Sequence, residues 1–571
     1  MDRHRGLQSV TTDAVVVGSG PGGAAAAEVL VRAGWTVTIV EKGRNHLLDP
    51  TAPEHLLGHF SNDEVKFFHR HFLGPDPLIE PRTFRAGPAD GEHSLVGEVN
   101  SIPSTVGGGG VHADGKVPRF RQEDFALRTT FGPVDGAWVE DWPLRYDELE
   151  PYYAEAERLI GVAGDDSANP FAAWRSGPYP MPPGAPMYGA TLSAEAARRV
   201  GLHPYAAPTA ANSIPYDGRP ACNNCGFCAF FGCPIHAKGD PVAMLQRALA
   251  SGRAELLAET FAARIVTRGR RATGVEVVAA DGTTSVIGAK SVVVAGGAVE
   301  TPRLLLLSGL DHPVLGRNLM VHFQTIAFGV MDHDLHAERG RAVTHVHDDA
   351  VLVDEAARQA ARRAGLPWVR GGLVEHGGPA LPVAEAKRYP WGPKHKSLMR
   401  SSPMRKRLWA FTMQGEDLAQ PTNRVDLDPS VRDARGLPVA RLTYAPHRHE
   451  LVASAHHRRA LVEVFAEMGA VGVGVVTSPG VPGELGWEGP SSAAPQSHHV
   501  MGTARMGTDP RTSVVDGFGR LHGLDNVVVA DSSVFVTSAG YGPTLTLVAL
   551  ALRAASALAG SSDPLQGGAV E

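Results

Sequence analysis

TDAVVVGSGPGGAAAAEVLVRAGWTVTIVEK, residues 12–42, is the stretch that decides the fold. Its apolar run from Thr12 to Val17 predicts a strand, and the segment Gly18 to Gly23 predicts a tight turn. The alanine-rich stretch Ala24 to Ala33 predicts a helix, and Thr36 to Val40 predicts a second strand. This order is that of a βαβ unit, which indicates an α/β fold with a parallel sheet.

Three glycines of the turn, Gly18, Gly20 and Gly23, have the G-x-G-x-x-G spacing, and Glu41 ends the second strand. Glycines at these positions permit a tight turn, close approach of the backbone to a pyrophosphate and close packing of helix on sheet. The helix N-terminus stabilises the negative charge, and Glu41 can bind ribose hydroxyls. We therefore expect a dinucleotide-binding unit, although the motif alone does not separate FAD from NAD.

The whole-chain composition indicates a globular protein with two domains. Of the 571 residues 43% are hydrophobic and 20% are charged, as is usual for such proteins. The net charge is -6, and the most basic stretch, residues 394–407, is interpreted as solvated surface rather than a nucleic-acid site. The sequence has no run of eighteen apolar residues and no signal peptide, so we expect a cytoplasmic protein with no membrane span.

Segments further along the chain add strands and a second domain. Ser291 to Ala295 and Asn526 to Asp531 predict buried strands, and Pro543 to Ala559 predicts a closing helix. Between about 321 and 494 the chain is rich in His, Arg and Pro and in hairpin-like segments. This texture favours an antiparallel cap over a continuation of the parallel sheet.

Several segments carry a resemblance to a known family. Gly297 to Gly309 (GAVETPRLLLLSG) resembles the second signature of the glucose-methanol-choline (GMC) oxidoreductases, but Asp311 then stands where a glycine is usual. His499 to Gly507 (HVMGTARMG) is similar to their catalytic HxxGTxRMG block. Asp531 to Phe535 and Pro543 to Thr546 resemble their flavin-closing end. These segments follow the family's order and span nearly the whole chain.

The resemblance implies FAD and a two-domain α/β architecture. It places a Rossmann-like FAD-binding region at residues 9–320, a sheet-based α+β substrate-binding cap at 321–494, and a C-terminal region completing the FAD domain and active site at 495–571. Ser61 to Arg85, the cysteine loop described below and Glu416 to Leu437 look closest to bacterial gluconate and sugar-alcohol dehydrogenase flavoproteins. The cap is where relatives diverge, so this narrows the substrate only loosely.

The resemblance also implies the site residues. His499 would stand beside the flavin N5 and accept the hydroxyl proton while the hydride leaves for the ring. The ordinary histidine pKa of about 6.5 suits that role, and His498 would point the other way. The expected FAD-binding residues come from the two glycine segments, the second strand and the C-terminal region: Gly18, Gly20, Gly23, Glu41, Gly107, Gly108, His112, Asp531, Pro543 and Thr544.

His112 lies in VGGGGVHADG, aligned with a histidine that some relatives join covalently to the flavin 8α-methyl. Other relatives carry FAD without that bond, in which case the glycine loop packs along the isoalloxazine with His112 nearby. We expect the non-covalent form.

The only four cysteines, Cys222, Cys225, Cys228 and Cys233, fall in one loop. Their spacing is one residue longer at the last gap than the ferredoxin run C-x2-C-x2-C-x3-C-P. Certain dehydrogenase relatives hold an iron-sulfur cluster in the equivalent loop. The spacing therefore leaves four hypotheses for these cysteines: an iron-sulfur cluster, structural thiols, a zinc site or a disulfide.

One position departs from the family pattern. Relatives usually have Asn-Pro or His-Pro where this chain has Gly542-Pro543, and that side chain shares the substrate hydroxyl with the first histidine. Without that side chain three hypotheses are open. His499 acts alone, a water or a cap residue replaces the missing group, or the protein no longer catalyses a redox reaction.

We interpret the chain as an FAD-dependent enzyme that oxidises a CH-OH group of an alcohol, polyol or sugar, and we favour a dehydrogenase over an oxidase. The alternatives are a non-redox lyase on the same fold and a degenerate electron-transfer subunit. The expected partners are a small-molecule substrate and an electron-acceptor protein or subunit, with no nucleic acid.

Overall fold

The structure is a computed structural model, and it describes residues 11–45, 78–91, 95–97, 99, 102–226, 228, 232–377, 390–481, 493–495 and 497–560. Residues 61–77 of the stretch that supported the closer resemblance lie outside the described residues.

The sheet that carries the N-terminal motif has seven strands in the order β7-β2-β1-β10-β9-β8, and β18 also pairs with β10. Strands β7, β2, β1, β10 and β18 run parallel, whereas β9 and β8 extend the sheet antiparallel. Their bounds are β1 Thr11–Val17, β2 Val37–Val40, β7 Ala254–Leu257, β8 Phe261–Arg268, β9 Arg271–Val278, β10 Thr284–Val294 and β18 Val527–Val529. The predicted βαβ opening and the two later buried strands are confirmed.

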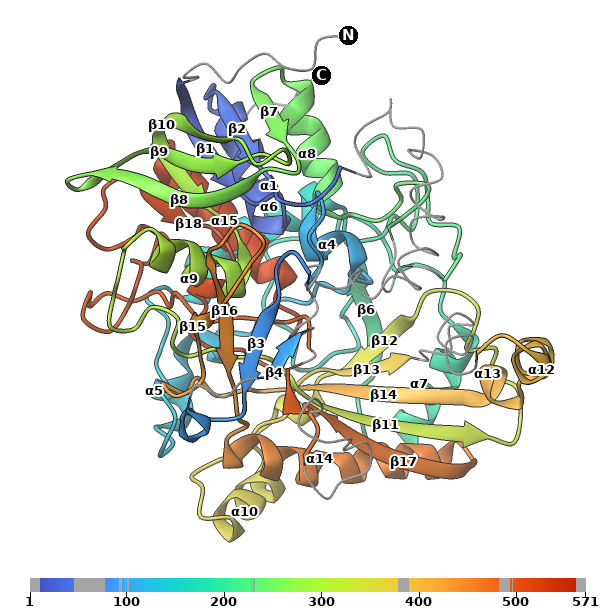
Figure 1. The fold of residues 1–571 in the computed structure, drawn as a ribbon. Coiled ribbons are helices and arrows are strands. Elements are labelled where there is room, and N and C mark those ends of the chain that lie inside the picture. The colour runs from blue at the N-terminus through green and yellow to red at the C-terminus, as the bar shows by residue number, and fades with distance from the viewer. Residues whose placement is uncertain are drawn as a thin grey trace.

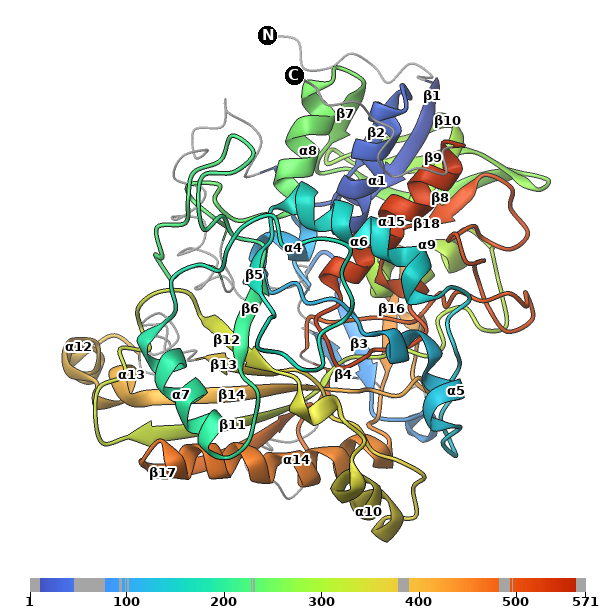
Figure 2. The same ribbon diagram turned by 180° about the vertical axis from the view of Figure 1, so that it is seen from behind.

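Helix α1 (Pro21–Arg32) leaves β1 through the glycine turn. Pro21 starts the helix because its missing N–H is not needed in the first turn. The residues 24–27 are fully buried alanines, which let α1 lie close to the sheet. Figure 2 shows α1, α6 (Tyr146–Ile160), α8 (Pro241–Ala250) and α15 (Thr544–Leu558) gathered on one face of this sheet.

The cap is a second seven-stranded sheet in the order β17-β11-β14-β13-β12-β6-β5, in which every pair is antiparallel. Its strands are β5 Ala163–Asp165, β6 Tyr205–Thr209, β11 Phe323–Met331, β12 Val343–His347, β13 Val374–Gly377, β14 Leu408–Gly415 and β17 Ala470–Ser478. Helices α7 (Tyr188–Arg199) and α14 (Arg448–Glu467) pack against one face, where Trp409, Phe411 and Met413 join their core.

A third sheet of four strands, β15-β16-β3-β4, lies between the other two in Figure 1. Its strands are β3 Arg82–Arg85, β4 Leu95–Gly97, β15 Arg424–Arg432 and β16 Pro438–Thr443. Helix α9 (Gly297–Leu307) packs on it and shares its apolar core.

The antiparallel cap expected for residues 321–494 is present, but its sheet also takes β5 and β6 from residues 163–209. These strands are three and five residues long, too short for periodicity to show which sheet they join. The bounds expected for the three regions therefore stay a prediction.

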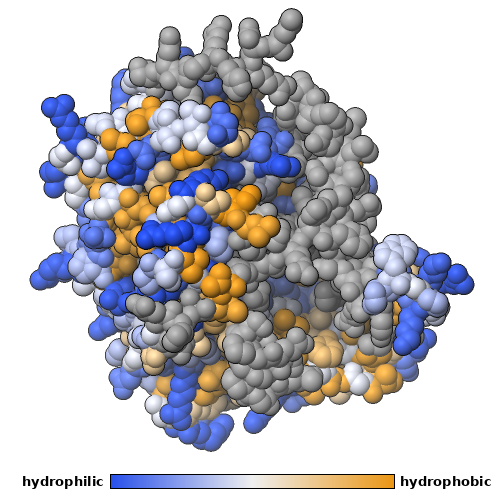
Figure 3. Space-filling view, in the orientation of Figure 1, coloured by the Kyte–Doolittle hydropathy of each residue, from blue (hydrophilic) through white to orange (hydrophobic). Residues whose placement is uncertain are grey.

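The basic stretch folds as α12 (Pro393–Ser401) and α13 (Pro403–Arg407). Helix α12 has no buried residue, and Figure 3 shows hydrophilic side chains at the edge where Figure 1 places both helices. This agrees with the interpretation as solvated surface. None of the helices in the described part of the chain combines the length and apolarity that crossing a bilayer requires.

Candidate functional site

The glycine turn has the shape that a bound pyrophosphate requires. A β-carbon added to Gly18 would lie 2.3 Å from the carbonyl oxygen of Ala295, and one added to Gly23 would lie 1.9 Å from the Gly18 carbonyl oxygen. Both glycines are thus fixed by packing. A β-carbon on Gly20 would meet nothing within 4 Å, so the turn is open on the side of Gly20, at the N-terminus of α1. This open cradle beside a helix N-terminus fits a dinucleotide phosphate.

Ser19 connects the turn with the two other expected FAD-binding segments. Its backbone N–H and its hydroxyl donate to Oε2 of Glu41 over 3.1 and 2.7 Å, and its Oγ accepts from the N–H of Gly107 over 3.0 Å. The other oxygen of Glu41 accepts from the N–H of Gly43. The motif argument did not single out Ser19, although it stands within the turn. The structure thus brings the first turn, Glu41 and the second glycine segment together.

Gly108 also lies against the first turn, because a β-carbon there would be 3.2 Å from Cα of Gly20. Gly107, with φ of 86°, caps the short helix α4 (Gly108–His112). His112 is buried at the end of that helix. Its covalent bond to the flavin and its role beside the ring stay predictions.

Asp531 has a structural environment. Its Oδ2 accepts from the N–H of Gly297 and the hydroxyl of Thr301, and its Oδ1 accepts from the N–H of Ser533. The carboxylate therefore joins the start of α9 to the turn after β18, and its role towards FAD stays a prediction. Pro543 and Thr544 form the N-terminus of α15, next to position 542.

The cysteine loop shows no metal centre. Within the described residues, no group of three or more His, Cys, Asp or Glu side chains is arranged to hold a metal ion. No disulfide joins the cysteines. Burial raises the pKa of Cys228 to about 11, which keeps its thiol protonated. The iron-sulfur cluster considered from the spacing therefore has no support in the structure.

His499 contacts a second histidine, which no sequence motif indicates. Its Nδ1 lies 2.8 Å from Nδ1 of His322, and the two rings meet edge to face with centroids 4.9 Å apart. His322 is fully buried just before β11, and its Nε2 lies 3.2 Å from the carbonyl oxygen of Ser538. The two histidines are 177 positions apart and belong to no common motif, so no local signal could have paired them.

Position 542 faces the same imidazole. A β-carbon on Gly542 would lie 3.8 Å from Cε1 and 3.9 Å from Nε2 of His499, and 3.8 Å from the carbonyl oxygen of Lys116. The side chain that relatives are expected to carry here would thus stand beside Nε2. His322 contacts the opposite nitrogen, so it does not take the place of that missing group.

Polar side chains project from the cap sheet towards this region. The register pairs Gln324 of β11 with Gln414 of β14, and Glu375 of β13 with Thr412. Side chains alternate along a strand, so these residues share the face opposite to the core that holds Met413. We call Gln324, Gln414 and Glu375 the polar strip.

Hydrogen bonds run along the polar strip to a buried cation. Gln324 donates to Gln414, and Gln414 donates to Glu375, each over 3.0 Å. Glu375 forms an ion pair with Lys116, which lies 3.2 Å from Asp114 as well. Burial opposes the charge of Lys116, but the two carboxylates raise its pKa, so it remains a cation.

The electrostatics keep both histidines neutral. Burial lowers the pKa of His322 to about 4. The pKa of His499 falls well below the ordinary value, first through burial and then through repulsion from Lys116 and from any proton on His322 or His498. The value near 6.5 assumed from the sequence is therefore wrong, because the sequence does not reveal this burial. A neutral imidazole retains a lone pair that can accept a proton.

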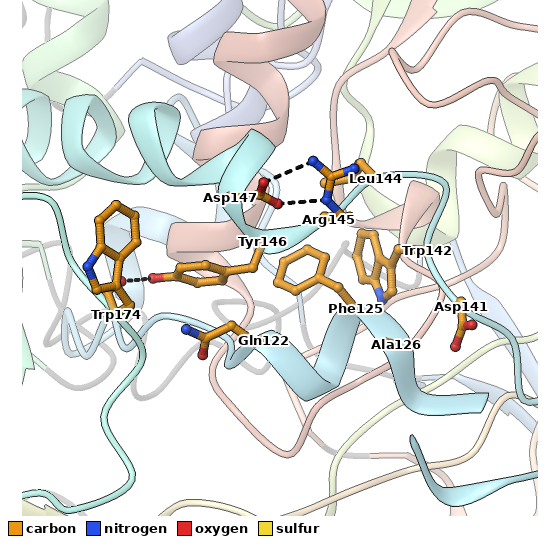
Figure 4. Close-up of a pocket in the computed structure, with 10 residues that line it drawn as sticks. All are labelled: Gln122, Phe125, Ala126, Asp141, Trp142, Leu144, Arg145, Tyr146, Asp147 and Trp174. Atoms are coloured by element: carbon orange, nitrogen blue, oxygen red, sulfur yellow. Dashed lines mark hydrogen bonds and ion pairs between the residues drawn. The ribbon is translucent and has the colours of Figure 1, made fainter. Parts of the chain in front are cut away.

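A separate surface pocket of about 540 Å³ lies between α6 and the 3-10 helix η2 (Gln122–Ala126). Figure 4 shows the rings of Phe125, Trp142 and Tyr146 along it and the Arg145–Asp147 ion pair at one edge. None of its ten lining residues is among the expected site residues, so it is not the site of His499.

Comparisons with known proteins agree with the arrangement. Residues 127–324 and 419–551 match the GMC oxidoreductase family, and residues 12–105 match the pyridine nucleotide-disulphide oxidoreductase family. A pyridoxine 4-oxidase from Mesorbium loti has the same fold at a TM-score of 0.60 and 18% identity, covering 95% of this chain and 98% of that one. A formate oxidase variant from Aspergillus oryzae has the same fold at a TM-score of 0.63 and 16% identity, covering 97% of this chain and 99% of that one.

Two curated relatives match along nearly their whole length. The 2-methyl-1,2-propanediol dehydrogenase of Mycolicibacterium austroafricanum is 30% identical, over 95% of this chain and 94% of its own. The gluconate 2-dehydrogenase flavoprotein of Pantoea cypripedii is 27% identical, over 96% and 93%. With both family regions in place around the His499 site, the chain belongs to the GMC oxidoreductase family.

Proposed function

We propose that this protein is a dehydrogenase that oxidises a CH-OH group of a polyol or sugar, with His499 as general base. The chain is an FAD-dependent oxidoreductase of CH-OH donors by its family. The observation that carries the finer proposal is the polar strip beside His499. Amide, carboxylate and ammonium groups recognise several hydroxyls at once and disfavour a purely apolar alcohol, whose binding would leave them unpaired.

Each group of the site has a task in this proposal. The Gly20 turn, Ser19 and Glu41 hold the dinucleotide, and FAD when bound supplies the hydride acceptor. His499 accepts the hydroxyl proton on the ring nitrogen that faces position 542. The polar strip and Lys116 orient the rest of the substrate, and Lys116 also stabilises negative charge that develops on the substrate oxygen.

Relatives support the substrate class by name. Besides the diol and gluconate dehydrogenases, the chain is 27% identical to the fructose dehydrogenase large subunit of Gluconobacter japonicus, over 96% of this chain and 98% of that one. That name describes one subunit of an assembly, which favours a protein electron acceptor for this chain too. The cytoplasmic location inferred from the sequence stays a prediction.

Anaerobic flavin reduction tests the proposal. Polyols and sugars are mixed with the holoenzyme and the flavin band is followed. We expect bleaching, and we expect His499→Ala to slow it at least about 100-fold with unchanged FAD content. His333→Ala is the matched control, because His333 is an exposed histidine on the surface of the cap.

Two outcomes would contradict the proposal. If no alcohol reduces the flavin, the lyase or the electron-transfer subunit is the better reading. If His499→Ala reduces as fast as the wild type, the base lies elsewhere.

A further inference from the structure

The hydrogen-bond partners of His322 and His499 determine which ring nitrogen of each histidine carries a hydrogen. A carbonyl oxygen only accepts hydrogen bonds. The ring nitrogen of His322 that lies 3.2 Å from the Ser538 carbonyl, Nε2, must therefore carry a hydrogen. A neutral imidazole has one N–H, so Nδ1 of His322 is then an acceptor.

This assignment decides the tautomer of the second ring. Nδ1 of His499 lies 2.8 Å from Nδ1 of His322. Two acceptors at that distance would repel, so Nδ1 of His499 must donate. A neutral His499 with its hydrogen on Nδ1 has its lone pair on Nε2.

That lone pair lies on the side of the ring that faces position 542. Nε2 is one of the two ring atoms of His499 nearest to position 542, and no hydrogen bond from the described residues reaches it. The chain from the Ser538 carbonyl through His322 to His499 thus ends on an acceptor that faces the substrate space.

We propose that His322 is a positioning residue, which holds the proton of His499 on Nδ1 and so makes Nε2 the base. The proposal rests on the proposed oxidation at His499 and adds how that base is prepared. An orienting partner that sets the tautomer of a histidine is a general device in acid-base sites. The burial that keeps both rings neutral supports it.

Two substitutions of His322 separate tautomer control from packing. In His322→Asn the amide oxygen replaces Nδ1, so it can still accept from His499. In His322→Gln the amide nitrogen replaces Nε2, so it can still donate to Ser538 but offers no acceptor at the Nδ1 position. The two side chains are both amides, so they form a matched pair.

We expect His322→Gln to lower the limiting rate of anaerobic flavin reduction about 10- to 100-fold, with little change in KM or FAD content. We expect His322→Asn to recover most of that rate. A purely structural role would give equal losses in the two variants, which would overturn the proposal.

A second readout does not depend on turnover. In ¹⁵N-histidine NMR of the holoenzyme, the His499 signals are identified by their loss in His499→Ala. The wild type and His322→Asn should carry hydrogen on Nδ1, and His322→Gln should shift it towards Nε2. Hydrogen on Nε2 in the wild type would refute the inference even if His499 is the base. If no alcohol reduces the flavin, the proposed function fails and this spectrum still decides the role of His322.

Discussion

Gly542 and His499 face each other so closely that a β-carbon at position 542 would lie 3.9 Å from Nε2. That distance is an ordinary van der Waals contact, so Gly542→Ala should be tolerated. Gly542→Asn would extend an amide into the same space, where the Lys116 carbonyl can accept a hydrogen bond from it. We expect Gly542→Asn to shift preference towards smaller alcohols.

The measurement is kcat/KM for a series of alcohols of increasing size. The ratio between a small and a large substrate should rise about 10-fold in Gly542→Asn, since steric exclusion at this scale is worth about 1–3 kcal/mol. Gly542→Ala serves as control and should leave the ratio close to that of the wild type. An equal ratio in both variants would show that position 542 does not border the substrate.

A second prediction concerns the open side of the glycine turn. A β-carbon at position 20 would meet no protein atom within 4 Å, and the φ of Gly20, -65°, is normal for any residue. Gly20→Val should therefore fold yet lose FAD, because the new side chain fills the path of the pyrophosphate. Flavin absorbance per protein after gel filtration measures the loss.

Gly177→Val is the control, because a β-carbon on Gly177 would also meet nothing within 4 Å and Gly177 is exposed in a loop. It should keep its FAD. A folded Gly20→Val protein with stoichiometric FAD would remove the first turn from the binding site.

The sequence predicted local structure well where one segment contains the whole signal. The stretch 12–42 has its strand, turn and helix in the predicted order, although the helix begins at Pro21 rather than at Ala24. Gly20 could be proposed as a phosphate-binding position because the turn, the helix N-terminus and Glu41 are all close in the chain.

Contacts that depend on distant segments could not be predicted. Gln324 and Glu375 lie in ordinary strand sequences, and only the register of the cap sheet brings them to one face. His322 precedes one of these strands and carries no motif of its own. The lowered pKa of His499 likewise results from burial by residues far away in the chain. Motif spacing therefore pointed to His499, the proposed base, but not to the residues that the fold brings close to it.

A third prediction concerns a buried ion network centred on Arg370. Arg370 contacts Asp124 over 2.5 Å and Glu416 over 2.9 Å, and all three side chains are almost fully buried. Glu416 in turn accepts from the Ser538 hydroxyl and the Ala539 N–H. Arg370→Met would leave buried carboxylates without their cation, so we expect a loss of about 3–5 kcal/mol in the free energy of unfolding.

Urea unfolding measures this, with Arg362→Met as the control. Arg362 pairs with Glu355 on the surface, where both side chains are more than half exposed. Such pairs contribute at most about 1 kcal/mol. Similar losses in the two variants would mean that the Arg370 network does not stabilise the fold.

The last prediction concerns the stability of the protein at acidic pH. His347 is buried in the cap with Nδ1 2.7 Å from Nε2 of His376, and burial lowers its pKa to about 4. In the unfolded chain the pKa of a histidine is about 6.5. Between that pH and about pH 4 the unfolded state therefore binds a proton at His347 that the folded state does not bind. The free energy of unfolding should therefore fall as the pH drops from about 6.5 to about 4, by about 3 kcal/mol for this residue.

His347→Asn removes the group, so its loss of stability between pH 7 and pH 5 should be smaller than that of the wild type in urea titrations, even if the variant is less stable at pH 7. His333→Asn is the control, because it makes the same substitution at an exposed histidine on the surface of the cap. If His347→Asn and His333→Asn lose stability equally on acidification, His347 is protonated in the folded protein or the cap opens before it titrates.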